Sequence, residues 1–194
     1  MKGLLLDVDY AEEEAQPRIR LFLKSGTESV VAIDPTFEQY FYVTTSNAEK
    51  VAKLISKLEL TESGRTIKPK SVDIVERTFL GNRVEVLKVA FHHPRDMPAL
   101  RHLVRELPGV KDIYEFDIPS ARRYLVDRDL VPTLGVSVSG KVEEGKGVKT
   151  LLLDGPPKPV YVPEQKLNVM SFDIEVYNPA GTPRPEKDPI IMIS

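Results

Sequence analysis

Residues 72–91 have the sequence VDIVERTFLGNRVEVLKVAF, which predicts two β-strands joined by a tight turn. β-Branched and aromatic residues favour an extended backbone, and Gly81-Asn82 suits a two-residue hairpin turn. We therefore expect strands over residues 72–80 and 83–91. This hairpin is the centre of the predicted fold, because a helical pattern lies on each side of it.

Before the hairpin, residues 46–49 (Ser-Asn-Ala-Glu) match a capping box that opens a helix. After it, Asp96 is expected to cap a second helix that Gly109 ends. Each helix carries an apolar stripe, formed by Val51, Leu54, Ile55 and Leu58 in the first and by Leu100, Leu103, Val104 and Leu107 in the second. With strands at residues 40–43 and 110–116, the order is βαββαβ. This order fits a ferredoxin-like unit with both helices on one face of an antiparallel sheet, so the fold class is α+β.

The flanking sequence predicts further β structure. Alternating apolar residues indicate a hairpin formed by residues 4–10 and 19–23. Residues 136–140 and 148–153 could pair as strands, with a turn at residues 143–147. We interpret residues 135–166 as a small β insertion followed by a connector between domains.

The triplet Asp173-Ile174-Glu175 lies in a strand that we expect over residues 169–177. Because side chains alternate across a strand, Ser171, Asp173 and Glu175 share one face, while apolar residues form the other face and can pack into a core. Two neighbouring carboxylates can bind Mg²⁺ or Mn²⁺, and the ion can activate a water for attack on a phosphodiester. The alternative is an ordinary strand with a solvated acidic face.

A Pro-rich loop at residues 178–189 leads to a second apolar strand, Ile190 to Ile193. That strand would leave an apolar edge, which predicts an edge-strand dimer of this chain. The chain has no cysteine, which excludes disulfides and thiolate metal sites, and it has no apolar run long enough to predict a membrane span or a membrane partner. Its net charge of −2 supplies no broad positive field, so any contact with DNA must come from a local patch.

Motifs along the whole chain resemble, in the same order, those of the archaeal-type family B DNA polymerases. Residues 172–175, Phe-Asp-Ile-Glu, resemble the first motif of the 3′→5′ proofreading exonuclease domain in that family. Further matches lie at residues 3–10, 36–42, 79–81, 93–98 and 114–125. The resemblance covers residues 3–194 and depends on this shared order of motifs.

The resemblance implies three parts. Residues 1–134 would be a template-binding and uracil-binding domain, and residues 135–166 the β insertion and connector. Residues 167–194 would be the truncated beginning of an RNase H-like exonuclease domain. The chain would then be a natural or engineered fragment of a cytoplasmic, nucleoid-associated polymerase. Its partners would be the template single strand, primer-template DNA and the remainder of the polymerase.

The resemblance also implies a pocket that captures uracil in the template strand. Carried over by motif, its residues are Tyr10, Gln39, Tyr40, Met97, Ile118, Ser120 and Arg123. Two positions depart from the family, which often has proline at Gln39 and an aromatic residue at Ser120; both changes widen the pocket or make it more polar. The alternative interpretation is core packing for Tyr10, Tyr40 and Met97, and a solvated helix face for Arg122-Arg123.

In the intact family, Asp173 and Glu175 would hold Mg²⁺ or Mn²⁺ for exonucleolytic cleavage. We expect the chain alone to catalyse neither polymerisation nor proofreading and to bind no metal tightly, because later motifs of both sites are missing. Two alternatives remain open at this point. One is a stand-alone module that binds single-stranded nucleic acid or uracil, and the other is a ferredoxin-like regulatory domain without a role in DNA binding.

Overall fold

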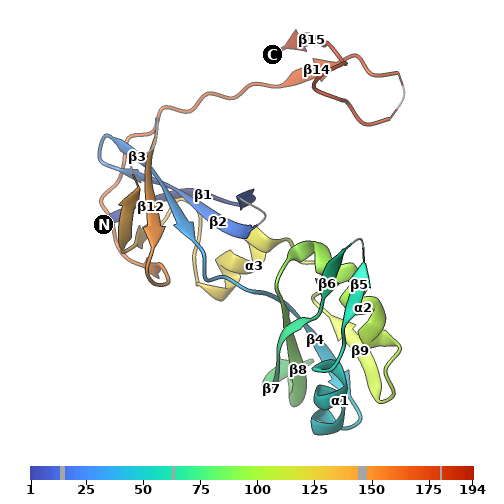
Figure 1. The fold of residues 1–194 in the computed structure, drawn as a ribbon. Coiled ribbons are helices and arrows are strands. Elements are labelled where there is room, and N and C mark those ends of the chain that lie inside the picture. Colours follow the sequence, from blue (N-terminus) through green and yellow to red (C-terminus); the bar gives the residue numbers. More distant parts are fainter. Residues whose placement is uncertain (14–15, 63, 144–147, 180) are drawn as a thin grey trace. The chain divides into compact units, whose positions relative to one another are not determined.

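The computed structural model describes residues 1–13, 16–62, 64–143, 148–179 and 181–194. The chain divides into two compact units, Met1–Pro163 and Glu164–Ser194. The first unit contains a seven-stranded sheet and a four-stranded sheet (Figure 1). Within the described ranges, every helix is too short or too polar to cross a membrane.

The seven-stranded sheet has the order β11-β12-β3-β2-β1-β10-β13. Its strands are β1 (Lys2–Glu13), β2 (Gln16–Ser25), β3 (Glu28–Asp34), β10 (Gly135–Ser137), β11 (Gly140–Glu143), β12 (Lys149–Leu153) and β13 (Lys158–Pro159). The expected first hairpin is confirmed, since β1 and β2 are antiparallel neighbours with Val8 opposite Leu21. Alternate residues of these strands build the core of the sheet, including Leu5, Leu21 and Leu23.

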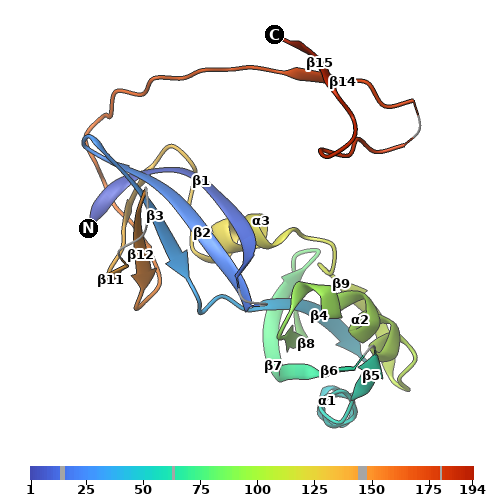
Figure 2. The same ribbon diagram turned by 45° about the horizontal axis from the view of Figure 1, so that its top comes forward.

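The segment interpreted as a β insertion does not form a sheet of its own. It supplies the strands β10 to β13, which join the sheet built by β1, β2 and β3 (Figure 2). β12 runs parallel to β3, and β10 pairs antiparallel with β1. The expected pairing of residues 136–140 with 148–153 holds only at Gly140, where β11 begins and pairs with β12. Val136 and Ser137 instead lie in β10 and pair with β1 and β13. The turn predicted at residues 143–147 falls mostly outside the described residues.

The four-stranded sheet is antiparallel and has the order β7-β8-β4-β9. Its strands are β4 (Gln39–Thr45), β7 (Pro69–Phe79), β8 (Asn82–Phe91) and β9 (Val110–Tyr114), and its helices are α1 (Ala48–Ile55) and α2 (Met97–Arg105). All six elements were predicted and are confirmed. Both helices pack on one face of the sheet, where Val51 and Ile55 of α1 and Leu100 and Val104 of α2 share a core with Phe41.

A short hairpin was missed between α1 and β7. It consists of β5 (Leu60–Glu62) and β6 (Arg65–Ile67), paired antiparallel with Leu60 opposite Ile67. Strands of three residues are too short to show a clear alternation of apolar and polar side chains. The hairpin is nevertheless important for the site below, because Arg65 lies in it.

The turn between β7 and β8 is one residue earlier than predicted. Leu80 and Gly81 form the two-residue loop, and Asn82 already belongs to β8. Both loop residues have a positive φ, 47° for Leu80 and 82° for Gly81. Positive φ at both central positions is what a type I′ hairpin turn requires, so a leucine occupies a position that glycine or asparagine normally takes.

Two predicted helix caps also differ. Asn47, and not Ser46, caps α1, because its side chain accepts a hydrogen bond from the Lys50 N–H at 2.9 Å. Asp96 is at the N-cap position of α2 as expected, but its side chain makes no capping hydrogen bond; it is buried and forms an ion pair with Arg65. A 3₁₀ turn, η1 (Pro94–Asp96), precedes α2, and His93 is its N-cap.

A third helix, α3 (Ser120–Asp127), contacts residues of both sheets. Its Tyr124 is fully buried in the core of the seven-stranded sheet and donates a hydrogen bond to Asp34 Oδ2 at 2.8 Å. Its Arg123 lies over the ring of Tyr40 in the four-stranded sheet, 4.1 Å from the ring centroid. The two residues follow each other in sequence, so one turn of α3 contacts both sheets.

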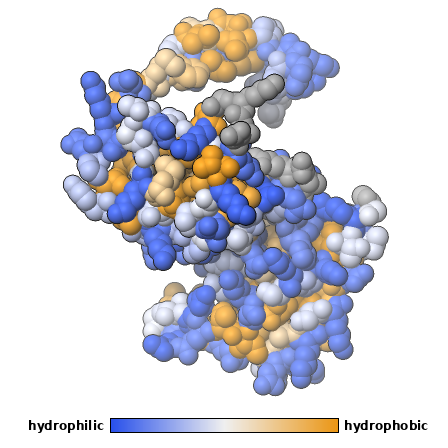
Figure 3. Space-filling view, turned by 60° about the vertical axis from the view of Figure 1, so that its left-hand side comes forward, coloured by the Kyte–Doolittle hydropathy of each residue, from blue (hydrophilic) through white to orange (hydrophobic). Residues whose placement is uncertain are grey.

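The second unit is a two-stranded antiparallel sheet of β14 (Ile174–Val176) and β15 (Ile190–Ile193). The second strand was predicted correctly, but the first is much shorter than the expected residues 169–177. Its apolar row is exposed, with Met170 at 81% and Phe172 at 66%, and apolar surface is visible on this unit (Figure 3). The expected packing of this row into a core is therefore not found among the described residues.

Candidate nucleic-acid interface

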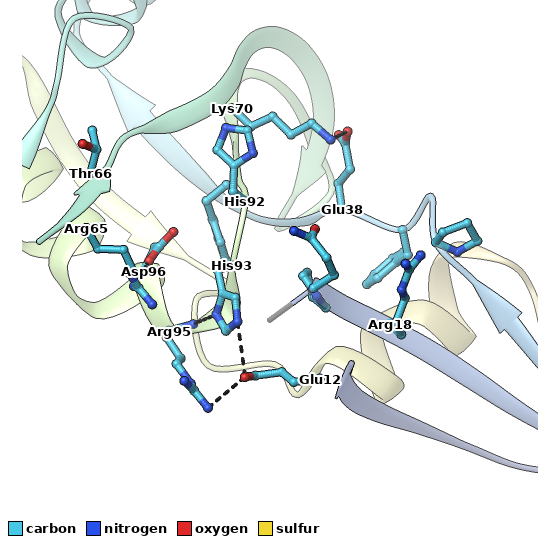
Figure 4. A pocket seen from close by; sticks show the side chains of 15 residues that line it. Glu12, Arg18, Glu38, Arg65, Thr66, Lys70, His92, His93, Arg95 and Asp96 are labelled. Carbon is cyan, nitrogen blue, oxygen red and sulfur yellow. Dashed lines mark hydrogen bonds and ion pairs between the residues drawn. The ribbon is translucent and has the colours of Figure 1, made fainter. Parts of the chain in front are cut away.

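A polar pocket with a volume of about 390 Å³ opens in the first unit. Its walls come from β1 and β2, the segment between β3 and β4, the β6 and β7 strands, and residues 91–96 (Figure 4). Six of the lining side chains are basic or can become so: Arg18, Arg65, Lys70, His92, His93 and Arg95. A pocket of this size and composition suits an anionic ligand.

Three carboxylates line the same pocket, and each is paired with a cation. Glu12 contacts Arg95 at 2.8 Å and His93 at 3.2 Å, and Glu38 contacts Lys70 at 2.5 Å. The third carboxylate, Asp96, pairs with Arg65. Figure 4 shows how Glu12 joins His93 and Arg95 along one side of the pocket.

The ring of His93 is fixed in one orientation. Its Nδ1 accepts a hydrogen bond from the Arg95 backbone N–H at 3.1 Å. The Nε2 atom is then the protonated nitrogen of the neutral ring and can donate to Glu12. His93 thus has a positioning role in the wall of the pocket.

A small cavity of about 10 Å³ adjoins the polar pocket and shares Pro17, Arg18, Phe37 and His92 with it. Three of the predicted uracil-pocket residues line this cavity, namely Tyr10, Gln39 and Ser120. Its volume is enough for about one water molecule, so a base could enter only if side chains moved. Gln39 Nε2 is buried and has no hydrogen-bond partner among the described residues.

Tyr10 is connected to the polar pocket through Glu12. The Tyr10 hydroxyl donates a hydrogen bond to Glu12 Oε1 at 3.2 Å. Burial, and then the negative charge of Glu12, raise the pKa of Tyr10 to about 12. At neutral pH the phenol is therefore a neutral hydrogen-bond donor beside the small cavity.

Tyr40 and Arg123 lie on a different face. Tyr40 follows Gln39 in β4, so its side chain points to the opposite face of the sheet, where it is buried. Arg123 is also buried and donates to the Glu115 carbonyl oxygen at 2.6 Å and to Glu115 Oε2 at 3.0 Å. The interpretation of Arg123 as part of a solvated helix face is therefore wrong, whereas its neighbour Arg122 is exposed.

The last two predicted pocket residues, Met97 and Ile118, are half-buried. Met97 packs against the core of the four-stranded sheet. The described linings of the polar pocket and the small cavity contain neither residue. The seven predicted residues thus fall into three groups: Tyr10, Gln39 and Ser120 at the small cavity, Tyr40 with Arg123, and Met97 and Ile118 elsewhere.

The acidic pair lies in the second unit. Glu175 is in β14 and Asp173 directly precedes it, and both side chains are exposed. Asp173 is held at the backbone by Ser194, with N–H to carbonyl distances of 2.7 and 3.0 Å. In the described part of the chain no three His, Cys, Asp or Glu residues gather as a metal site. Two carboxylates nevertheless suit Mg²⁺, which binds through one or two of them together with substrate phosphates.

Comparison with known proteins shows what the chain is similar to. The family model described as "DNA polymerase family B, exonuclease domain" matches residues 111–194. The DNA polymerase of Thermococcus kodakarensis is 36% identical over 191 residues, which is 98% of this chain, and that of Desulfurococcus sp. (strain Tok) is 35% identical over the same share. The structure of the family B DNA polymerase from Pyrobaculum calidifontis matches the whole chain with 30% identity and a TM-score of 0.72. Over almost its whole length the chain is therefore similar to family B DNA polymerases.

The chain spans about a tenth and a fifth of the length of those two curated polymerases, and a quarter of the solved one. The comparisons confirm the resemblance to family B polymerases that the motifs indicated. They also confirm which region of those polymerases the chain resembles. A mixed, sheet-rich α+β architecture is confirmed as well.

Sequence reasoning missed most of the polar pocket. Its basic residues, Arg18, Arg65, Lys70 and Arg95, come from four separate segments and form no charge run. The spacing of charged residues in the sequence therefore gave no indication of the pocket. Only the pairing of β1 with β2 and the position of residues 91–96 bring these side chains together.

Proposed function

We propose that this chain is the front portion of a DNA-directed DNA polymerase with 3′→5′ exonuclease activity. The observation that carries the proposal is the similarity to proteins named DNA polymerase over 98% of the chain. Residues 1–134 would read the template strand, residues 135–166 would connect, and residues 167–194 would begin the exonuclease domain. The intact enzyme would act on chromosomal DNA in the cytoplasm.

We also propose that residues 39–114 form a ferredoxin-like unit. The strand order β7-β8-β4-β9 and the chain order β4-α1-β7-β8-α2-β9 support it, because they are those of the βαββαβ arrangement. This unit would be a scaffold that holds Gln39 and residues 91–96 beside the seven-stranded sheet. The fold by itself assigns no activity.

We infer that the first domain senses uracil in the template. The small cavity at Tyr10, Gln39 and Ser120 is the proposed entry point for the base. Arg123 would brace the neighbouring wall, because it is stacked on Tyr40 and anchored to Glu115. Rejection of thymine needs a wall close to the C5-methyl position, and the cavity is narrow enough to provide one.

In the intact enzyme, Asp173 and Glu175 would supply carboxylate ligands for Mg²⁺ or Mn²⁺. Such an ion, when bound, would activate water for attack on the 3′-terminal phosphodiester. The backbone pairing of Asp173 with Ser194 fixes the start of β14, which keeps both carboxylates at one end of the hairpin. The remaining ligands would come from the rest of the exonuclease domain and from the substrate.

Binding of single strands to the purified chain tests the uracil proposal. We expect tighter binding, by fluorescence anisotropy, to a strand that contains one uracil than to the same strand with thymine. The preference should be lost in Tyr10→Ala and retained in Tyr177→Ala, a control at an exposed tyrosine of the second unit. Equal affinity for the two strands would refute uracil sensing by this chain.

The polar pocket favours one alternative, a module that binds single-stranded nucleic acid without regard to uracil. In that case the same experiment would give measurable and equal affinities. A regulatory domain without a role in DNA binding would give no saturable binding at near-physiological salt. An edge-strand dimer of the isolated chain is compatible with any of these functions.

A further inference from the structure

Arg18 carries a charge that the polar pocket leaves uncompensated. The pocket has four lysine or arginine side chains and three carboxylates. Arg65, Lys70 and Arg95 are paired with Asp96, Glu38 and Glu12, respectively. In the described part of the chain no hydrogen bond or ion pair joins the half-buried Arg18 side chain to another group. Its guanidinium is therefore available to an anion from outside the chain.

Gln39 offers a second unused group in the same place. It lines the small cavity together with Arg18, and its Nε2 atom is buried without a hydrogen-bond partner among the described residues. A buried amide donor without an acceptor is costly, and an acceptor atom of a ligand would remove that cost. Phe37 lines both the small cavity and the polar pocket, so it provides an apolar surface to each.

We propose that Arg18 and Gln39 form a two-part site for one nucleotide of a single strand. Arg18 binds the phosphodiester in the polar pocket, and Gln39 Nε2 donates a hydrogen bond to an acceptor on the edge of the base. The proposal rests on the template-reading function and names two of its contacts. It does not depend on uracil, because uracil, thymine and the other bases all carry acceptor atoms.

Arg18 and Gln39 lie next to each other for a structural reason. Arg18 is in β2 of the seven-stranded sheet, and Gln39 begins β4 of the four-stranded sheet. Ion pairs from Glu12 in β1 to His93 and Arg95 connect the seven-stranded sheet to the segment that follows β8 of the four-stranded sheet. The Arg18 guanidinium and the Gln39 amide are therefore held on two different sheets. One nucleotide can contact both, with its phosphate on Arg18 and its base on Gln39.

Two DNA single strands with the same number of phosphates distinguish the phosphate contact of Arg18 from the base contact of Gln39. One is a short thymidine strand, and the other is an abasic strand of equal length. The whole chain is titrated against both over a range of salt concentrations, because each phosphate contact on a single strand contributes about 0.7 to the slope of log affinity against log salt.

For Arg18→Gln we expect weaker binding of both strands and a slope that is less steep by about 0.7. Arg18→Lys should retain the slope. The matched control is Arg105→Gln, which removes the same charge from an exposed position in the last turn of α2, outside the pocket and the cavity. For Gln39→Leu we expect roughly fivefold weaker binding of the thymidine strand, with no change for the abasic strand.

A slope that changes equally in Arg18→Gln and Arg105→Gln would overturn the phosphate contact. An equal effect of Gln39→Leu on the two strands would overturn the base contact, and absence of saturable binding by the unaltered chain would overturn both. Thermal melting followed by circular dichroism shows that each variant is folded. Equal binding of uracil and thymine strands would refute uracil sensing and leave this nucleotide site intact, so the two proposals fail separately.

Discussion

The Tyr40 hydroxyl donates a hydrogen bond to Asp127 Oδ1 over 2.9 Å, which joins the start of β4 to the last residue of α3. The Tyr40 ring is also covered by cations, with Arg123 and Lys88 each 4.1 Å from its centroid. Because Tyr124 of the same helix is buried in the core of the seven-stranded sheet, these contacts hold α3 between elements of both sheets. The wall next to the small cavity depends on this arrangement.

Removal of the Tyr40 hydroxyl tests how much the hydrogen bond stabilises the fold. Tyr40→Phe keeps the ring beneath Arg123 and Lys88 but leaves Asp127 without this donor. We expect the free energy of unfolding in urea to fall by about 1 kcal/mol. Tyr177→Phe, at an exposed ring in the second unit, should leave the free energy of unfolding unchanged. Equal stability of the two variants would show that the bond contributes nothing measurable.

The turn at Leu80 predicts a stabilising substitution. Leu80 has a φ of 47°, which strains the backbone of a residue with a Cβ atom. Its side chain is 86% exposed, so burial contributes little stability to offset this strain. Asparagine tolerates this conformation, and we expect Leu80→Asn to raise the free energy of unfolding by about 1 kcal/mol. Leu134→Asn is the control, because Leu134 is also exposed and is absent from the positive-φ residues. A lower melting temperature for Leu80→Asn than for the unaltered chain would contradict this expectation.

Many elements of the fold could be predicted because their apolar residues recur with a clear period in the sequence. Alternation with period two located β1 and β2, the turn signal at Gly81-Asn82 located β7 and β8, and helical stripes located α1 and α2. The partners of β10 to β13 could not be predicted in the same way, because period two shows which residues share a face and not which strand lies alongside. The parallel pairing of β12 with β3 joins segments more than 100 residues apart, and no local signal specifies it.

The candidate site could be predicted only in part, for a related reason. Adjacent strand residues point to opposite faces, so Gln39 and Tyr40 could not both face one cavity, although the motif resemblance placed them together. Arg18 and His92 line both cavities from positions that no motif contains. The row at Met170 and Phe172 failed as a core prediction because both residues precede the short strand β14 and are exposed.

The pKa of Tyr10 predicts a loss of stability at alkaline pH. The usual tyrosine value is about 10, and burial and Glu12 raise the pKa of Tyr10 in the folded chain to about 12. Between these values the unfolded chain has lost the phenolic proton while the folded chain retains it, so a rise in pH favours unfolding. The stabilising contribution is complete below pH 10 and is lost as the pH rises from about 10 to about 12.

Urea unfolding at several pH values between 9 and 12 measures this effect, where the range follows from the two pKa values. Tyr10→Phe should show a smaller loss of stability over the range than the unaltered chain. Part of the loss should remain, because burial also raises the pKa of Tyr40 and of Tyr124. Identical pH profiles for Tyr10→Phe and the unaltered chain would show that this hydroxyl titrates normally in the folded state.

The exposed strand β15 predicts self-association of the purified chain. All four of its residues are exposed, and Ile191 and Ile193 are 62% and 67% accessible. An apolar edge strand of this kind can pair with the same strand of a second copy. Sedimentation velocity over a range of concentrations should therefore show a dimer, and Ile191→Lys should shift it to monomer because a charge blocks such an edge. Leu80→Lys places the same charge on an exposed leucine outside β15 and should leave the dimer intact. A chain that stays monomeric at all concentrations, or equal effects of the two lysines, would mean that β15 does not mediate self-association.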